Sequence, residues 1–293
     1  MHRSGFVNII GNPNVGKSTL MNALVGERLS IITSKAQTTR HRIMGIVDGE
    51  DFQIVYSDTP GILKPSYKLQ ESMMKFVTGA LTDADVILYV TDTVEQSERS
   101  AEIVDSIRRS GIPTVVVINK IDLSTPEALE ALVDKWQAEI PGAQVVPTSA
   151  KENFNIEGLF RTILSLLPEG PAFYPKDTLT DKTLRFFASE IIREKILKFY
   201  DKEIPYCCEI EIESYKEEPT IDRIAATIYV ARDSQKGILI GHKGEKLKRV
   251  GQTAREDMEQ FLGKKVFLQL FVKVSDDWRN NERQLRRFGY EQE

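Results

Sequence analysis

A glycine-rich segment near the N-terminus has the residues needed to bind phosphate groups. It reads G-N-P-N-V-G-K-S from Gly11 to Ser18, after an apolar run at residues 6–10 and before a helical pattern at residues 17–25. The G-x-x-x-x-G-K-S motif requires this strand–loop–helix context. Its glycines let backbone N–H groups surround an anion at a helix N-terminus, its lysine reaches the β- and γ-phosphates, and its serine ligates Mg²⁺. The predicted phosphate-binding residues are Gly11, Asn12, Pro13, Asn14, Val15, Gly16, Lys17, Ser18 and Thr19.

A second short motif follows an apolar run at residues 52–56 and reads Asp58, Thr59, Pro60, Gly61. A carboxylate at this place can hold Mg²⁺ through water, and a glycine N–H can sense a γ-phosphate. Alone, such a tetrapeptide is usually a turn. Its position after the phosphate loop favours a nucleotide-binding role.

Two further motifs predict the base. Asn119, Lys120, Ile121 and Asp122 follow the apolar run at residues 114–118. A carboxylate at Asp122 can accept hydrogen bonds from N1–H and the exocyclic amine of guanine, and adenine offers neither donor there. We expect Asn119 to fix the loop and the Lys120 stem to cover the base. Ser149, Ala150 and Lys151 lie where a last base-contacting loop belongs. Together the four motifs predict GTP, not ATP, as the ligand.

The stretch from Ile31 to His41 is long, polar and β-branched, as expected of a switch loop ordered by γ-phosphate and Mg²⁺. A threonine hydroxyl is the expected Mg²⁺ ligand, and we favour Thr39 over the alternative, Thr38. The predicted metal ligands are therefore Ser18, Thr39 and Asp58. Ile62 occupies the position at which some GTPases carry a glutamine that orients water, and an isoleucine cannot do this. We assign catalytic roles to Lys17, Thr39 and Gly61.

The C-terminal part contains a G-x-x-G loop between two helical patterns. Such a loop clamps the nucleic-acid backbone in K-homology (KH) domains, although its usual meaning is only a tight turn. Residues 232–287 carry 14 Lys or Arg against 8 Asp or Glu, in a chain of net charge −4. A local basic surface of this kind favours RNA binding. The candidate RNA-binding residues are Ile240, Gly241, His242, Lys243, Gly244, Lys246, Lys248 and Arg249.

The elements that position these motifs change character along the chain. Short apolar runs alternate with helical patterns up to about residue 167, which predicts an α/β fold with a doubly wound, mostly parallel sheet. Prolines and a glycine at residues 168–175 mark a linker. The pattern after it predicts a smaller α+β domain made of a helix, two strands, two helices and a strand. We expect a nucleotide-binding domain at residues 1–170, a linker at 171–180 and an RNA-binding domain with a basic C-terminal helix at 181–293.

The predicted strands are residues 6–10, 45–47, 52–56, 86–90, 114–118 and 144–146, then 207–215, 221–232 and 266–274. The predicted helices are residues 17–25, 97–109, 126–140, 156–167 and 181–200.

Other features of the chain limit its location and chemistry. Cys207 and Cys208 are adjacent, a spacing that rarely allows a disulfide, and we interpret them as buried thiols on a strand in a reducing cytosol. No apolar run approaches the roughly 18 residues that span a bilayer, and the N-terminus has no signal-peptide pattern. Glu209, Glu211 and Glu213 alternate along a predicted strand, which we interpret as a solvent-facing side. We expect a cytoplasmic monomer.

The motifs together resemble the Era family of bacterial GTPases, within the TrmE-Era-EngA-like group. The resemblance rests on G-N-P-N-V-G-K-S, Q-T-T-R-H at residues 37–41, D-T-P-G followed by Ile62, N-K-I-D and S-A-K. It extends to the second domain, whose element order matches a type II KH domain. It implies GTP hydrolysis with Mg²⁺, binding near the 3′ end of 16S rRNA, a role in maturing the 30S ribosomal subunit, and peripheral contact with the inner face of the cell membrane. In related members an asparagine matching Asn14 binds K⁺, so we hypothesise K⁺-stimulated hydrolysis.

The sequence also allows two other functions. A P-loop kinase or ATPase would share the phosphate loop, but the motif at residues 119–122 argues against it. Alternatively, a GTPase could use its second domain to bind protein or membrane in place of RNA. The basic C-terminal segment is compatible with either a solvated helix or a contact with RNA or membrane.

Overall fold

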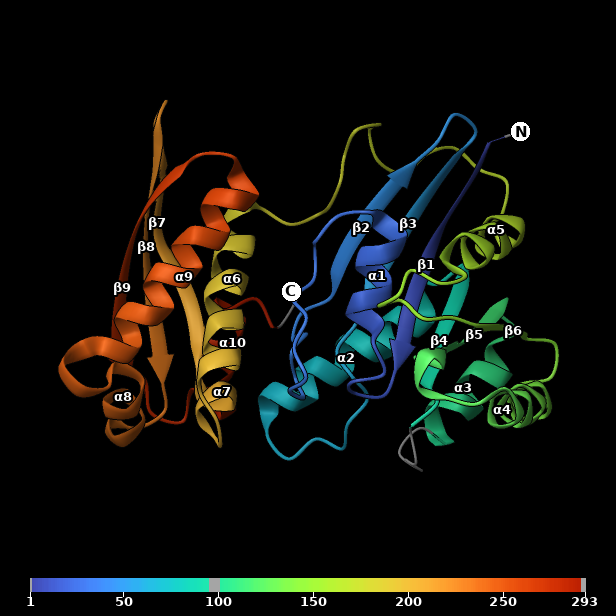
Figure 1. Ribbon diagram of the computed structural model, residues 1–293, viewed down its shortest axis with the longest axis horizontal. Coiled ribbons are helices and arrows are strands. Elements are labelled where there is room, and N and C mark those ends of the chain that lie inside the picture. Colours follow the sequence, from blue (N-terminus) through green and yellow to red (C-terminus); the bar gives the residue numbers. More distant parts are fainter. Residues whose placement is uncertain (1, 95–100, 291–293) are drawn as a thin grey trace. The chain divides into compact units, whose positions relative to one another are not determined.

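The computed structural model describes residues 2–94 and 101–290, which form two compact units (Figure 1). The first unit comprises residues up to 65 and 73–181, and the second comprises residues 66–72 and 182 onward. The first four residues of the helix predicted at 97–109 lie outside the described residues. Among the described helices, none is both long enough and apolar enough to cross a membrane.

The first unit is built on a six-stranded sheet in the order β2-β3-β1-β4-β5-β6. Only the β2–β3 pair is antiparallel, so the predicted mostly parallel sheet is confirmed. The parallel strands carry their last residues to one edge, and the four predicted nucleotide motifs begin at or just after the ends of β1, β3, β5 and β6. The strands are β1 (Arg3–Gly11), β2 (Ile43–Asp48), β3 (Phe52–Asp58), β4 (Val86–Asp92), β5 (Thr114–Asn119) and β6 (Gln144–Pro147).

Helices cover both faces of this sheet. An apolar cluster joins α2, α3 and α4 to β1, β4 and β5, and it includes Val77, Val104 and Trp136. Helix α1 contacts β1, β2 and β3 and packs beside α5. Helix α2 was not among the predicted elements, although the spacing of Leu69, Met73, Val77 and Ala80 is typical of a helix with one buried face. The helices are α1 (Lys17–Val25), α2 (Lys68–Thr82), α3 (Ala101–Ser110), α4 (Pro126–Glu139) and α5 (Ile156–Leu166).

The segment predicted as a linker, residues 171–180, runs along the β2–β3 side of the first unit. The Gln53 side chain accepts hydrogen bonds from the amides of Phe173 and Tyr174, at 2.7 and 2.9 Å. The Thr180 hydroxyl donates to the Met44 carbonyl at 2.6 Å. The segment therefore extends the first unit, and the boundary between the units falls at residues 181 and 182.

The second unit has a three-stranded sheet in the order β7-β8-β9, with β7 antiparallel and β9 parallel to β8. Helices α6 and α9 lie side by side on one face of it (Figure 1). The predicted α+β arrangement is confirmed. Its elements are α6 (Leu184–Phe199), α7 (Ile204–Cys207), β7 (Glu209–Glu217), β8 (Ile221–Val230), α8 (Asp233–Ile240), α9 (Glu245–Leu262), β9 (Lys265–Val274) and α10 (Glu282–Arg287).

The opposite face of this sheet is partly covered by the C-terminal segment. Tyr290 is buried, and its hydroxyl donates to Glu209 at 2.6 Å. Glu211 accepts from the Tyr229 hydroxyl at 2.9 Å and pairs with Arg287. The interpretation of Glu209 and its neighbours as a solvent-facing row is therefore wrong for Glu209, because sequence alternation does not reveal a tail that folds back from 81 residues away. Cys207 and Cys208 are buried thiols as predicted, but they lie in and after α7 and not on the strand.

Candidate functional site

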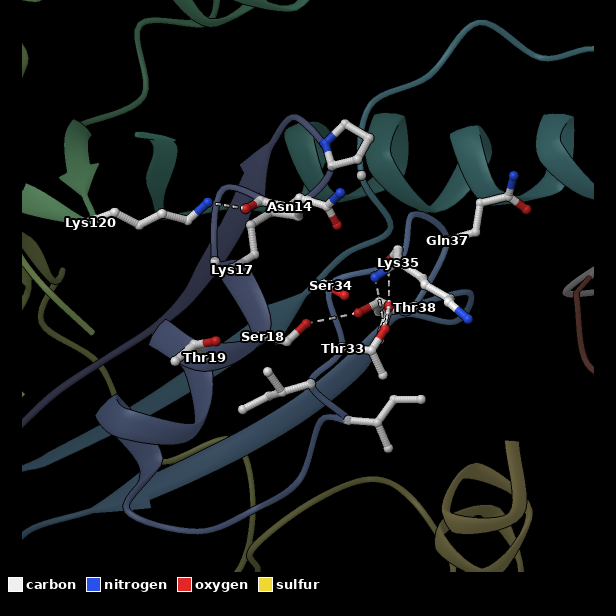
Figure 2. A pocket seen from close by; sticks show the side chains of 16 residues that line it. Asn14, Lys17, Ser18, Thr19, Thr33, Ser34, Lys35, Gln37, Thr38 and Lys120 are labelled. Carbon is white, nitrogen blue, oxygen red and sulfur yellow. Dashed lines mark hydrogen bonds between the residues drawn. The ribbon is translucent and has the colours of Figure 1, made fainter. Parts of the chain in front are cut away.

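The phosphate loop connects the end of β1 to the start of α1. A β-carbon on Gly16 would lie 2.3 Å from the Asn119 amide nitrogen, and its φ of +95° is left-handed, so only glycine fits this position. Lys17 is buried, and its ammonium group donates to the carbonyls of Gly11 and Asn12 at 3.0 and 2.8 Å. The charge is thus held over the loop, where the helix N-terminus adds its own partial positive charge. A pocket opens here between the phosphate loop and the switch segment (Figure 2).

Three oxygen-bearing side chains converge beside this loop. The Ser18 hydroxyl donates to Asp58 Oδ2 at 2.7 Å and lies 2.9 Å from the Thr39 hydroxyl. The Thr39 hydroxyl donates to the same carboxylate oxygen at 3.3 Å. Burial raises the pKa of Asp58 above its ordinary value, while the Lys17 charge and the hydroxyls of Ser18 and Thr39 act in the opposite direction.

The second oxygen of Asp58 provides a test of whether this cluster fits a metal ion. Asp58 Oδ1 is fully buried and accepts no hydrogen bond from any residue that the structure describes. A buried carboxylate oxygen without a partner is costly in a folded protein, so it indicates a missing charged or hydrogen-bonding group. Hydroxyl and carboxylate oxygens around a compact point suit Mg²⁺. The residues present fit that ion.

The two threonines considered as metal ligands point to different partners. Thr39 lies with Ser18 and Asp58, as described above. The Thr38 hydroxyl donates to the Lys35 carbonyl at 2.6 Å and lies 2.6 Å from the Thr33 hydroxyl, within the switch segment itself (Figure 2). Thr39 is therefore the threonine that joins the cluster.

The loops predicted to bind guanine are tied together at the sheet edge. The Asn119 side chain donates to the Val15 carbonyl at 2.9 Å and accepts from the Ala150 amide at 3.0 Å. The Ser149 hydroxyl donates to Asp122 at 2.6 Å and so orients its carboxylate. These bonds join the phosphate loop to both base-contacting loops. The Lys151 side chain is exposed and pairs with Glu152, so it stands apart from the cluster.

The residues after Asp58 close the other side of the loop. The Thr59 hydroxyl donates to the Ile9 carbonyl at 2.7 Å, and a β-carbon on Gly61 would lie 2.8 Å from the Pro13 backbone. Ile62 is 5% exposed and packs in the apolar cluster with Ile10 and Val77. The side chain at this position is thus buried in the core and cannot orient water for attack on a phosphate.

The G-x-x-G loop joins α8 to α9 in the second unit. Gly241 and Gly244 have φ values of +74° and +80°, and Lys243 between them has φ +48°. His242 and Lys243 are exposed, as are Lys246, Lys248 and Arg249 in the first turns of α9. Leu239, from the apolar run before the loop, is fully buried. The loop therefore presents a helix N-terminus and several cations on one accessible stretch.

Two aromatic residues that were not predicted as functional hold these cations. The Arg249 guanidinium lies 4.3 Å from the centre of the Phe199 ring, and the Lys246 ammonium lies 5.8 Å from that of Tyr200. Phe199 is the last residue of α6 and Tyr200 follows it, and the Tyr200 hydroxyl donates to the Leu239 carbonyl at 2.6 Å. Cation–π contacts of this kind orient flexible side chains. The apolar spacing of α6 predicts burial of these rings but not their cationic partners.

The chain resembles known proteins over its whole length. Residues 6–120 match the family described as 50S ribosome-binding GTPase, and residues 203–279 match the KH domain family. It is 45% identical over 291 residues to GTPase Era of Staphylococcus haemolyticus (strain JCSC1435), with 99% of this chain and 97% of the relative covered. It is also 45% identical over 293 residues to GTPase Era of Alkaliphilus metalliredigens (strain QYMF), with 99% of both chains covered.

Two solved structures share the entire fold. Era in complex with MgGDPNP and nucleotides 1506–1542 of 16S ribosomal RNA has a TM-score of 0.95, 40% identity and complete coverage of both chains. An Era variant of Aquifex aeolicus bound to GDP and AlF4⁻ has the same TM-score and identity, with 99% of this chain and 100% of the other covered.

Proposed function

Because this chain belongs to the Era family of GTPases, we propose that it couples a cycle of GTP hydrolysis to binding of 16S rRNA near its 3′ end. The chain is a GTP hydrolase that binds GTP, GDP and Mg²⁺. The proposed outcome of the cycle is maturation of the 30S subunit in the cytoplasm. The observation that carries the proposal is that one chain holds both a complete nucleotide site and an exposed G-x-x-G loop beside cations.

The proposed Mg²⁺ ligands are the hydroxyls of Ser18 and Thr39, with Asp58 acting through water. The ion would neutralise charge on the β- and γ-phosphates when bound. Lys17 supplies a second positive charge. Gly61 packs closely against the Pro13 backbone, and its amide is the proposed donor to a γ-phosphate. Asp122 accepts from the guanine edge, with Ser149 fixing its orientation at 2.6 Å. Because Thr39 belongs to the switch segment, its contact with the ion beside the γ-phosphate would order that segment.

We propose that Asn14 holds a K⁺ ion that supplies charge during hydrolysis. Asn14 lines the pocket beside Lys17 and Ser18, and its backbone is left-handed, with φ +66°. Ile62 is buried, so it provides no substitute for a water-orienting glutamine. The test compares GTP turnover in K⁺ and in Na⁺ for wild type and Asn14→Ala. We expect stimulation by K⁺ in wild type alone, and equal wild-type rates in both salts would refute the K⁺ site.

The RNA-binding proposal is tested with RNA that carries the 16S 3′-terminal sequence. Gly241→Asp and Gly244→Asp each place a negative charge at a left-handed position in the loop. We expect affinity to fall by about 100-fold, because phosphate is repelled and close approach is lost. Gly263→Asp is the matched control: Gly263 has φ +63° and lies at the other end of α9, about 27 Å away at 1.5 Å per residue.

The outcomes of this experiment distinguish an RNA-binding from a membrane-binding function of the second domain. Normal RNA binding by both loop variants would show that the loop is not the RNA site. Failure of the wild type to bind RNA, together with capture on anionic vesicles, would favour a membrane-binding second domain. Family resemblance extends the proposal to a monomer with peripheral contact at the inner membrane face. Sedimentation and vesicle flotation of the full chain test these two points.

A further inference from the structure

A buried carboxylate at the end of β4 contacts the nucleotide site without belonging to any of its motifs. Asp92 is the last residue of β4, and its register partner in the parallel strand β5 is Asn119. Its side chain is 6% exposed and lies 2.6 Å from the Lys120 ammonium nitrogen. The same nitrogen donates to the Asn14 carbonyl at 2.5 Å (Figure 2). One lysine thus joins β4, the guanine loop and the phosphate loop.

Both ends of this contact are fixed by further hydrogen bonds. The other oxygen of Asp92 accepts from the Val94 amide at 3.0 Å, so the carboxylate cannot rotate freely. The Thr93 hydroxyl donates to the Lys120 carbonyl at 3.0 Å, which holds the lysine backbone against the end of β4. A lysine side chain has considerable rotational freedom and needs such partners to occupy a single geometry.

The contact falls on a residue whose backbone is unusual. Asn14 has φ +66°, a left-handed conformation that is unfavourable for a non-glycine residue. A charge-assisted hydrogen bond from Lys120 to the Asn14 carbonyl can offset that cost. The direction of the Asn14 side chain depends on this backbone angle. The bond from the Lys120 ammonium group therefore constrains the backbone from which the Asn14 side chain projects.

We propose that Asp92 is a positioning residue, which sets the Asn14 conformation and the Lys120 stem over the guanine ring by holding the lysine ammonium group. Its role in orienting Asn14 toward a cation rests on the proposed function; its role in nucleotide retention does not. Within the part of the chain that the structure describes, the Asp92 carboxylate accepts hydrogen bonds from Val94 and Lys120 and from no residue of the phosphate loop. It acts through Lys120.

The decisive test is a double-mutant cycle on release of a fluorescent GDP analogue from the full chain. Asp92→Asn keeps the side-chain shape and the bond to the Val94 amide but removes the charge. We expect GDP release to become about 10-fold faster, as for loss of a hydrogen bond between charged groups. Lys120→Met should produce a larger increase. Adding Asp92→Asn to Lys120→Met should then change the rate by less than about twofold, because the two residues act as a unit.

Additive effects in the cycle, or a release rate for Asp92→Asn equal to wild type, would overturn the proposal. Asp105→Asn is the matched control, because it removes a carboxylate that pairs with Arg108 on the surface of α3, outside the nucleotide site. It should leave GDP release unchanged. Thermal unfolding of Asp92→Asn should match wild type within a few degrees, which separates positioning from a general loss of structure.

Potassium provides a second readout. If Asp92 orients Asn14, the K⁺ concentration for half-maximal GTP turnover should rise about fivefold in Asp92→Asn, with the maximal rate largely retained. An unchanged half-maximal concentration would contradict the orienting role. If wild-type turnover does not respond to K⁺, the proposed K⁺ site fails, and the GDP-release cycle still decides the role of Asp92.

Discussion

The phosphate loop and the G-x-x-G loop both place glycines before the N-terminus of a helix, but they are held very differently. Lys17 in the first loop is buried and bonded to two carbonyls, and Asn119 ties the loop to its neighbours. The second loop is exposed, and its cations rest on the rings of Phe199 and Tyr200. Rigid charge placement suits catalysis, whereas exposed cations on an aromatic support suit binding of an extended polyanion.

The largest effect should come from the charge at the centre of the phosphate loop. Lys17→Ala removes a buried ammonium group that stabilises charge on the transferred phosphoryl group, so we expect single-turnover GTP hydrolysis to fall by about 10³-fold. Lys246→Ala, which removes an exposed lysine from the first turn of α9 beside the G-x-x-G loop, should leave hydrolysis within about twofold of wild type. Similar losses in both variants would break the distinction between the two loops.

The metal cluster offers a sharper comparison within the nucleotide site. Thr39 lies with Ser18 and Asp58, whereas Thr38 bonds within the switch segment. We expect Thr39→Ala to raise the Mg²⁺ concentration needed for hydrolysis by about 10-fold or more, and Thr38→Ala to change it by less than about threefold. A Mg²⁺ titration of GTP turnover measures both. A reversed order would assign the ligand to Thr38.

Sequence reasoning predicted the nucleotide site more completely than the rest because its motifs sit at strand ends. Parallel strands carry their last residues to one edge, so the positions of Gly11, Asp58 and Asn119 follow from the strands alone. The same logic applies to Asp92, which ends β4, but a single aspartate after a strand forms no recognisable motif. That Asp92 pairs with Lys120 is evident only in the folded structure, where the ends of β4 and β5 lie side by side.

The second unit shows where sequence patterns stop being informative. The order of its strands and helices followed from apolar periodicity. The burial of Glu209 and the contact between Arg249 and Phe199 did not, because both join segments that are far apart in sequence. A G-x-x-G tetrapeptide predicts a tight turn, and only the surrounding charge favours RNA. Long-range side-chain contacts therefore limit what this part of the sequence reveals.

Within the exposed loop region, Arg249 should act as a phosphate contact without sequence preference. We expect Arg249→Ala to weaken RNA binding about 10-fold for every RNA tested and to reduce the slope of log affinity against log salt by about 1. Arg255→Ala is a matched control on the same helix, since Arg255 lies six residues after Arg249 and pairs with Glu259, one turn beyond it. Loss of affinity for one RNA sequence alone would indicate that Arg249 contacts a base.

The smallest effect should come from the aromatic support itself. Phe199→Leu keeps an apolar side chain in the core but removes the ring 4.3 Å from Arg249, so RNA affinity should fall about threefold, equivalent to a cation–π contact of about 0.7 kcal/mol. Because the ring acts only by orienting the guanidinium, the same substitution should have no further effect on RNA binding in an Arg249→Ala background. A further loss of RNA affinity in that background would mean that Phe199 contacts the RNA directly. The RNA-binding surface would then include the end of α6 as well as the G-x-x-G loop.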